Sequence, residues 1–189
     1  MIKLKKKYKG IMTAFILFYM FGIIVFTIEV AAVKMNILTT MAEDIQTDLI
    51  LSNSAVYKHI DKKALGDLEP KLIISDYTAA YNGMKEYLIY NMELSNNLEP
   101  KSDAIIKGPI EIKDFIIYNI KGDKVDIVTL RNGAFNVETK GISELVVTPN
   151  NHVVTSTTVT TTIEMDIQNM FGRVERQSIS VDTDLIDKK

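Results

Sequence analysis

The sequence lacks several residues and motifs on which enzyme active sites depend. It contains no cysteine among its 189 residues and only two histidines, His59 and His152. The absence of cysteine excludes disulfide bonds, a thiol nucleophile and a zinc–thiolate site. Neither histidine lies in a metal-ligand spacing such as HExxH, so both are predicted to be surface residues. No nucleophile elbow, phosphate-binding loop or dinucleotide fingerprint is present, and we therefore predict a protein without catalytic residues or a cofactor.

The chain also lacks an excess of charge of either sign. Its formal net charge is −2, from 22 basic and 24 acidic residues. A nucleic-acid-binding domain is expected to carry a basic face, so this balance argues against a nucleic-acid partner. The one dense basic cluster is at the N-terminus, at Lys3, Lys5, Lys6, Lys7 and Lys9.

A long apolar run follows the lysines. Residues 10–33 contain one charged residue, Glu29, and are long enough for a helix that crosses a bilayer. Lysines on one side only indicate which side is cytoplasmic. The sequence thus predicts a cytoplasmic tail at 1–9, a transmembrane helix at 10–33 and an extracytoplasmic domain at 34–189. The alternative is a secretory signal cleaved after Ala32, which would release a secreted protein.

Glu29 has two interpretations. A carboxylate at bilayer depth costs a few kcal/mol, and less near an interface. Since Glu29 lies near the outer end of the run, its side chain could reach the lipid headgroups. The other hypothesis is that Glu29 is a helix–helix contact and pairs with a partner helix.

The pattern beyond the membrane segment predicts an α+β fold. Leu38, Met41, Ile45 and Leu49 recur at helical spacing, so the first helix should continue as an amphipathic stem over 34–57. A second helix is predicted over 75–94, with Ser75 or Asp76 as its N-cap and a tyrosine stripe that packs in the core. An antiparallel β region should fill 109–185. Its five expected strands are 110–118, 125–130, 142–148, 153–167 and 174–184.

Two polar segments in the β region admit more than one interpretation. Threonine-rich residues 155–162 suit either an exposed sheet face or an edge that pairs with a neighbouring sheet. Asp182 and Asp184, with Asp187 beyond, have too few oxygen ligands for a calcium loop. These aspartates are therefore predicted to lie on a solvated strand face.

The layout resembles that of type IV pilin-like proteins, and most closely the TadE/TadF-like pseudopilins of bacterial Tad (Flp) pilus systems. Three segments carry the resemblance: Lys7-Tyr8-Lys9-Gly10 before the apolar run, the amphipathic continuation over 41–49, and Met170-Phe171-Gly172 at the turn of the closing hairpin. The family implies processing after a glycine, here Gly10. It also has a glutamate five residues beyond that glycine, where this chain has Phe15.

The resemblance implies a non-enzymatic, single-pass membrane protein that acts as a minor structural subunit of a Tad-type pilus or secretion assembly. Its expected partners are the membrane and other subunits of that assembly, in a homo- or hetero-oligomer. Two alternatives remain from the residues themselves: a membrane-tethered domain that binds or senses an extracellular ligand, and the secreted protein cleaved after Ala32.

Overall fold

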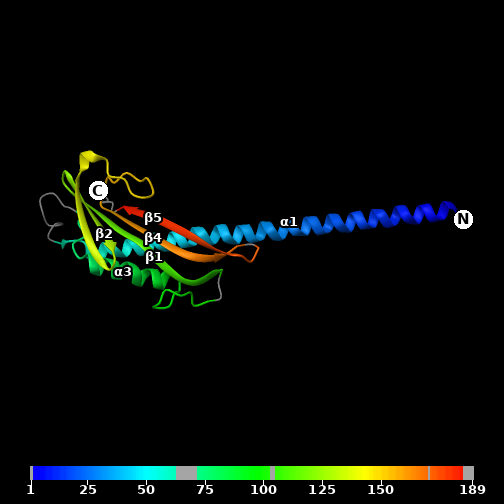
Figure 1. The fold of residues 1–189 in the computed structure, drawn as a ribbon, viewed down its shortest axis with the longest axis horizontal. Coiled ribbons are helices and arrows are strands. Elements are labelled where there is room, and N and C mark those ends of the chain that lie inside the picture. The colour runs from blue at the N-terminus through cyan, green and yellow to red at the C-terminus, as the bar shows by residue number, and fades with distance from the viewer. Residues whose placement is uncertain (1, 63–71, 103–104, 170, 185–189) are drawn as a thin grey trace. The chain divides into compact units, whose positions relative to one another are not determined.

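A computed structural model describes residues 2–62, 72–102, 105–169 and 171–184, and the side chains from residue 10 onward. The fold is α+β, as predicted: a long N-terminal helix, a second helix and a five-stranded antiparallel sheet (Figure 1). The helical elements are α1 (Ile2–Ser54), the 3-10 turn η1 (Ala55–His59), α3 (Tyr77–Asn91) and the 3-10 turn η2 (Ile142–Glu144). The strands are β1 (Ile106–Lys121), β2 (Lys124–Arg131), β3 (Ala134–Gly141), β4 (Thr158–Gln168) and β5 (Val174–Asp184).

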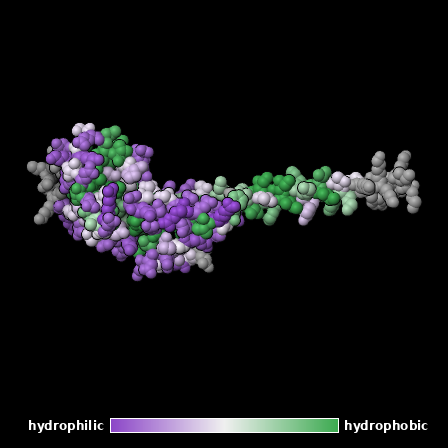
Figure 2. Space-filling model, viewed as in Figure 1, coloured by the Kyte–Doolittle hydropathy of each residue, from purple (hydrophilic) through white to green (hydrophobic). Residues whose placement is uncertain are grey.

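The chain divides into two compact units, Met1–Ala42 and Glu43–Lys189. The first unit is formed by the N-terminal part of α1. This helix is long and apolar enough to cross a membrane, and no residue of its most apolar 18-residue window is buried within the structure. Figure 2 shows that hydrophobic residues predominate along the described part of this segment, whereas hydrophilic residues dominate the visible surface of the second unit.

The second unit begins with the last turns of α1, whose apolar stripe enters the core. Ile45 is 4% exposed and Leu49 is fully buried. The helix therefore continues past the apolar run, and its predicted amphipathic face is confirmed here. Ala55 and Val56 of η1 extend the same buried surface, and α3 packs against η1.

Helix α3 lies where the sequence predicted a second helix. Its N-cap is Asp76, whose side chain accepts a hydrogen bond from the backbone N–H of Ala79 at 2.9 Å. Ala80, Met84 and Leu88 form its buried stripe. The predicted packing role of the tyrosines is confirmed for two of them: Tyr77 lies 5.9 Å from Phe135 and Tyr81 lies 5.4 Å from Phe115, between ring centroids.

The sheet has the order β3-β2-β1-β4-β5, with every neighbouring pair antiparallel. The β1–β2 and β2–β3 hairpins close through two-residue turns. Gly122 has φ +69° in the first turn, and Asn132 and Gly133 have φ +52° and +76° in the second. Positive φ at both central positions is the geometry that Asn-Gly tolerates best.

The predicted third strand is in the wrong place. It was expected over 142–148, but the structure has β3 at Ala134–Gly141 and η2 directly after it. The Asn-Gly turn returns the chain at once, so the strand must start at residue 134. Since β3 is an edge strand with six of its eight residues well exposed or polar, it carries little of the hydrophobic alternation that reveals a strand.

Both interpretations of the threonine-rich segment are wrong. Strand β4 lies between β1 and β5, so it has no free edge for another sheet. Thr158, Thr160 and Thr161 are fully buried rather than exposed. The sheet therefore has two covered faces at this point: a helix face, which packs against α1 and α3, and a strap face, which is covered by residues 142–157, here called the strap.

Candidate functional site

The residues singled out at the N-terminus all lie on α1. Lys3, Lys5, Lys6, Lys7 and Lys9 occupy its first turns, and their side chains are outside the described residues. Gly10 and Glu29 are exposed on the first unit. The structure therefore brings none of the described members of this set into a common site.

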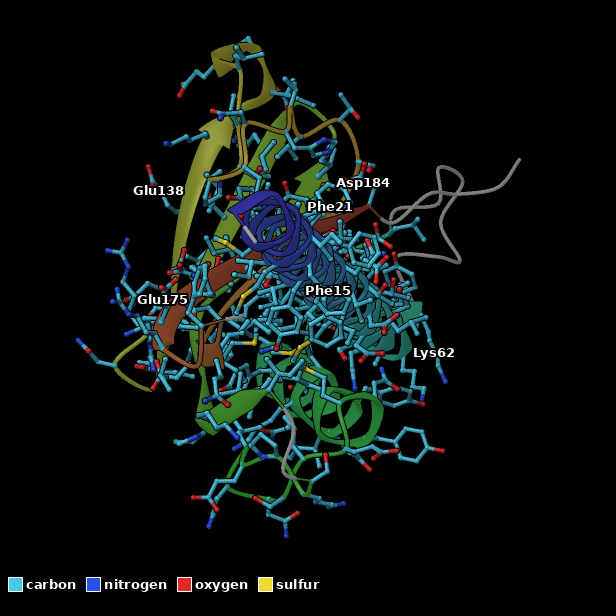
Figure 3. The ribbon with its side chains drawn as sticks, turned by 90° about the vertical axis from the view of Figure 1, so that its right-hand side faces the viewer. Phe15, Phe21, Lys62, Glu138, Glu175 and Asp184 are labelled. Carbon is cyan, nitrogen blue, oxygen red and sulfur yellow. The ribbon has the colours of Figure 1, made fainter. Side chains whose placement is uncertain are left out.

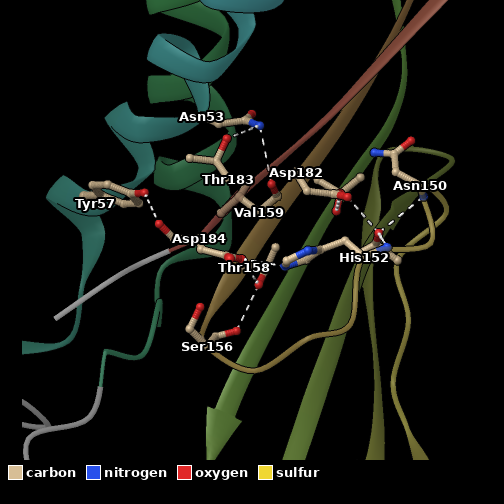
Figure 4. Close-up of polar contacts among 12 residues, drawn as sticks. Asn53, Tyr57, Asn150, His152, Ser156, Thr158, Val159, Asp182, Thr183 and Asp184 are labelled. Carbon is tan, nitrogen blue, oxygen red and sulfur yellow. Dashed lines mark hydrogen bonds and ion pairs between the residues drawn. The ribbon is translucent and has the colours of Figure 1, made fainter.

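A second cluster, which the sequence did not predict, forms where the strap meets strand β5. Asp182 projects from the strap face of β5 and accepts two hydrogen bonds. One comes from Thr148 Oγ1 in the strap at 2.8 Å, and the other from Thr160 Oγ1 on β4 at 2.6 Å (Figure 4). Both carboxylate oxygens of Asp182 are thus used to join the strap to two strands.

Asp184 makes the matching contacts one pleat further along. Its Oδ1 accepts a hydrogen bond from Thr158 Oγ1 at 2.7 Å and lies 3.1 Å from Nε2 of His152 in the strap. Its backbone carbonyl accepts a hydrogen bond from the Tyr57 hydroxyl at 2.8 Å. The prediction of a solvated strand face is therefore wrong for Asp182 and Asp184, because Thr158 and Thr160 on the neighbouring strand β4 place their hydroxyls beside these carboxylates. Asp187 lies outside the described residues.

The two histidines have different surroundings. His152 is a half-exposed side chain tied to Asp184. His59 ends η1, and its Nε2 would lie 3.2 Å from a Cβ placed on Gly83. Glycine lowers the intrinsic helix stability of α3 at position 83. Because it has no side chain, it also lets His59 of η1 approach α3 closely. Among the described residues, no group of three His, Asp or Glu side chains is placed to hold a metal ion.

The strap also buries an apolar cluster on the same sheet face. Val146 and Val154 of the strap pack against Ile116, Tyr118 and Val125. Burial raises the pKa of the Tyr118 hydroxyl to about 12, with further contributions from the charges of Asp182 and Asp114. Tyr118 therefore stays neutral at physiological pH. We infer that the apolar cluster and the two aspartates together hold the strap against the sheet. The carboxylates of Asp182 and Asp184 are already hydrogen-bonded to donors of the protein itself.

Two buried asparagines hold the opposite, helix face. Asn53 near the end of α1 donates through Nδ2 to Val159 O, Val181 O and Thr183 Oγ1, and its Oδ1 accepts from Thr161 Oγ1 at 2.6 Å. Asn119 on β1 pairs with both backbone groups of Ile74 at 2.9 Å. Neither role was predicted from the sequence, although Asn119, a single asparagine in the apolar run of residues 115–120, was a signal that could have identified that position.

An open groove with mixed polar and aromatic walls, of about 920 Å³, lies on the second unit. It lies between the end of α1, α3 and the loop after α3. Its walls include Asp48, Glu86 and Glu93, the tyrosines Tyr87 and Tyr90, and Lys101. None of the three carboxylates forms an ion pair with another described residue. Burial raises the pKa of the Asp48 carboxyl, and the nearby charge of Asp44 raises it further.

Tyr87 already binds one cation within this region. The ammonium of Lys58 lies 4.4 Å from the centroid of its ring and contacts its hydroxyl. Tyr90 is 81% exposed and offers a second aromatic surface. Carboxylates and tyrosine rings together favour a positively charged ligand.

No family model, no curated protein and no solved structure matches this chain. The site geometry and the sequence pattern are therefore the whole basis for assigning a function.

Proposed function

We propose that the protein is a single-pass membrane protein with a structural role, acting as a minor pseudopilin-like subunit of a Tad-type pilus or secretion assembly. Its N-terminus would be cytoplasmic and residues 34–189 extracytoplasmic. It would act by binding its neighbours in the assembly, without a reaction of its own.

The observation that carries this proposal is that two parts of α1 have different surroundings. One part of this helix has the length and composition of a membrane span and buries none of its apolar side chains. Its last turns supply Ile45 and Leu49 to the core of the α+β unit. The same continuous helix thus provides a membrane anchor and a structural element of the folded domain.

The pilus role is supported by the layout alone: a basic start, an apolar helix with an amphipathic continuation, and an α+β domain closed by a hairpin. The polar contacts described above favour a structural role for that domain. Asp182 and Asp184 are engaged by threonines and a histidine. Buried Asn53 joins α1 to the sheet, and buried Asn119 joins β1 to the backbone of Ile74.

The test combines location with processing. In cells of the native host, the tagged full-length chain should fractionate with membranes and with sheared pili, and its deletion should reduce piliation. N-terminal sequencing then separates the routes: a start at Met1 means an unprocessed anchor, at Ile11 pilin-like processing, and at Val33 secretion. Recovery of the chain only from the medium, starting at Val33, would overturn the proposal.

One observation favours a second candidate function, a membrane-tethered domain that binds a cationic ligand. The groove lined by Asp48, Glu86, Tyr87 and Tyr90 has the size of a small-molecule site and an acidic, aromatic wall. An NMR titration of the full chain in detergent micelles with a lysine- and arginine-containing peptide should shift the resonances of these residues. An acidic peptide of equal length is the control, and equal shifts with both peptides would exclude this function.

A further inference from the structure

The apolar part of α1 is not uniform around its circumference. One face forms a shallow groove of about 400 Å³ whose lining residues recur at helical spacing. They are Phe15, Phe18, Tyr19, Gly22, Ile23 and Phe26. Gly22 forms its floor, since no heavy atom lies within 4 Å of the place where a Cβ would stand. The aromatic side chains around it are 67–78% exposed.

Phe21, which does not line the groove, provides a contrast. At about 100° per residue, Phe21 lies about 120° from Phe15 around the helix. Figure 3 shows these two side chains leaving α1 in different directions. The groove is therefore a property of one face and not of aromatic composition in general.

Glu29 lies on the groove face. Phe15, Gly22 and Glu29 are spaced seven residues apart, and a straight helix drifts only about 20° over that interval. Glu29 thus follows Gly22 on the same line, about 10 Å further along the axis. The residues one turn away on either side of it, Val25, Phe26, Ala32 and Val33, are all apolar and supply no positive charge.

We propose that this face binds the transmembrane helix of a different protein, one that carries a lysine or arginine at the depth of Glu29. The inference rests on the proposed membrane span. Close approach at Gly22 gives the packing that drives helix association in lipid, where apolar surface alone gives no preference for protein over lipid. A basic side chain compensates the carboxylate, and on its way to Glu29 it passes the ring of Phe26, a cation–π acceptor.

A second copy of this chain fits the face less well. Copies inserted with the same orientation would place Glu29 against Glu29 at one depth. Like charges in a medium of low dielectric repel strongly. Charge complementarity therefore selects a partner of different sequence.

Photo-crosslinking in native membranes tests the proposal on the full-length chain. A photoreactive residue at Tyr19 or Phe26 should give one adduct with a second protein, and the crosslinked peptide of that protein should be a transmembrane helix with a lysine or arginine. The same residue at Met20 or Ile24, on the opposite face, is the matched control. We expect at least about tenfold less adduct from the control positions, corresponding to roughly 1.4 kcal/mol.

Charge exchange then tests the pairing itself. Glu29→Lys should reduce the adduct by about tenfold or more, and changing the basic residue of the partner to glutamate should restore it. The double variant Ile28→Glu/Glu29→Ile keeps the composition but moves the carboxylate about 100° around the helix, and should behave like Glu29→Lys without being restored.

Three results would overturn the inference: an adduct of twice the mass of this chain, equal adduct from both faces, or no restoration by the exchanged charge. A chain that still fractionates with membranes and pili in those cases leaves the proposed function standing. Release of the wild-type chain from the membrane would instead overturn both.

Discussion

The two faces of the sheet are both covered, but by different means. The helix face is covered by α1 and α3, and its side chains Phe115, Ile117 and Ile163 are at most 1% exposed. The strap face is covered by a segment with little regular structure, which buries Val146 and Val154 and is tied down by hydrogen bonds to Asp182 and Asp184. From this difference we expect packing on the helix face to determine the free energy of global unfolding. The strap should detach from its face in local openings that leave the rest of the fold intact.

The largest effect is expected from Leu49, which is fully buried on the helix face. Leu49→Ala should lower the free energy of unfolding by about 2–5 kcal/mol, because it removes buried methyl groups and leaves a cavity. Denaturant titration of the full chain in detergent micelles, followed by tyrosine fluorescence, measures this. Leu51, in the same helical turn but 51% exposed, is the control. A loss no greater for Leu49→Ala than for Leu51→Ala would contradict a core on this face.

The next effect concerns the buried amide that joins α1 to the sheet. Asn53→Ala removes the acceptor of the Thr161 hydroxyl and the donor to Thr183, so buried polar groups lose their partners. We expect a loss of about 2–3 kcal/mol in the same unfolding experiment. Thr47→Ala, at an exposed position of the same helix, removes a bond to Glu43 O within the helix and should cost well under about 1 kcal/mol. Equal losses for the two variants would show that the amide does not hold the helix to the sheet.

An effect on the strap face should depend on pH. The pKa of Tyr118 is about 12 in the folded protein against 10.0 for an ordinary tyrosine, so the neutral form is favoured on folding. This contribution to stability is complete below pH 10 and is lost as the pH rises through about 12, on the order of 2 kcal/mol in total. Tyr118→Phe should remove that alkaline loss, whereas Tyr90→Phe, at an exposed site, should not.

The tyrosinate absorbance of the folded protein gives an independent reading of the same group. One tyrosine should titrate near pH 12, and Asp182→Asn should lower its pKa because the aspartate charge contributes to the shift. An unchanged titration in Tyr118→Phe would assign the late-titrating group to another residue.

The smallest effect is expected from the link between strap and β5. Thr148→Val removes one of the two hydrogen bonds that Asp182 accepts, together with the bonds that Thr148 Oγ1 accepts from the backbone N–H groups of Asn150 and His152 within the strap. The cost should be about 1 kcal/mol and confined to the strap. Amide exchange at Val154, whose N–H donates to Val146 O, should therefore accelerate about fivefold while global unfolding barely changes. Thr155→Val, at an exposed strap position, should leave exchange unchanged. A global loss from Thr148→Val would mean that the two faces are one cooperative unit.

The sequence predicted the fold where its periodicity was strong. The stem around Ile45 and Leu49, the helix capped by Asp76 and the turns at Gly122 and Asn132-Gly133 are all found in the structure. It failed at β3, because a polar edge strand has little alternation. The candidate site was not predictable, because Asp182 and Asp184 meet Thr148, His152, Thr158 and Thr160 only through strand register and the path of the strap.

The sequence by itself determined the apolar helix, its charged flank and the α+β order of elements. These follow from local composition and spacing, which act along the chain. The tertiary structure decided that the threonine-rich strand is an interior strand, that Asp182 and Asp184 hold the strap, and that Asn53 and Asn119 fasten the helix face. Those roles depend on which buried donors and acceptors meet across more than 30 residues of chain in each case. Because a buried polar group is tolerated only when a partner lies within hydrogen-bonding distance, it is the packing of distant segments that gives these residues their function.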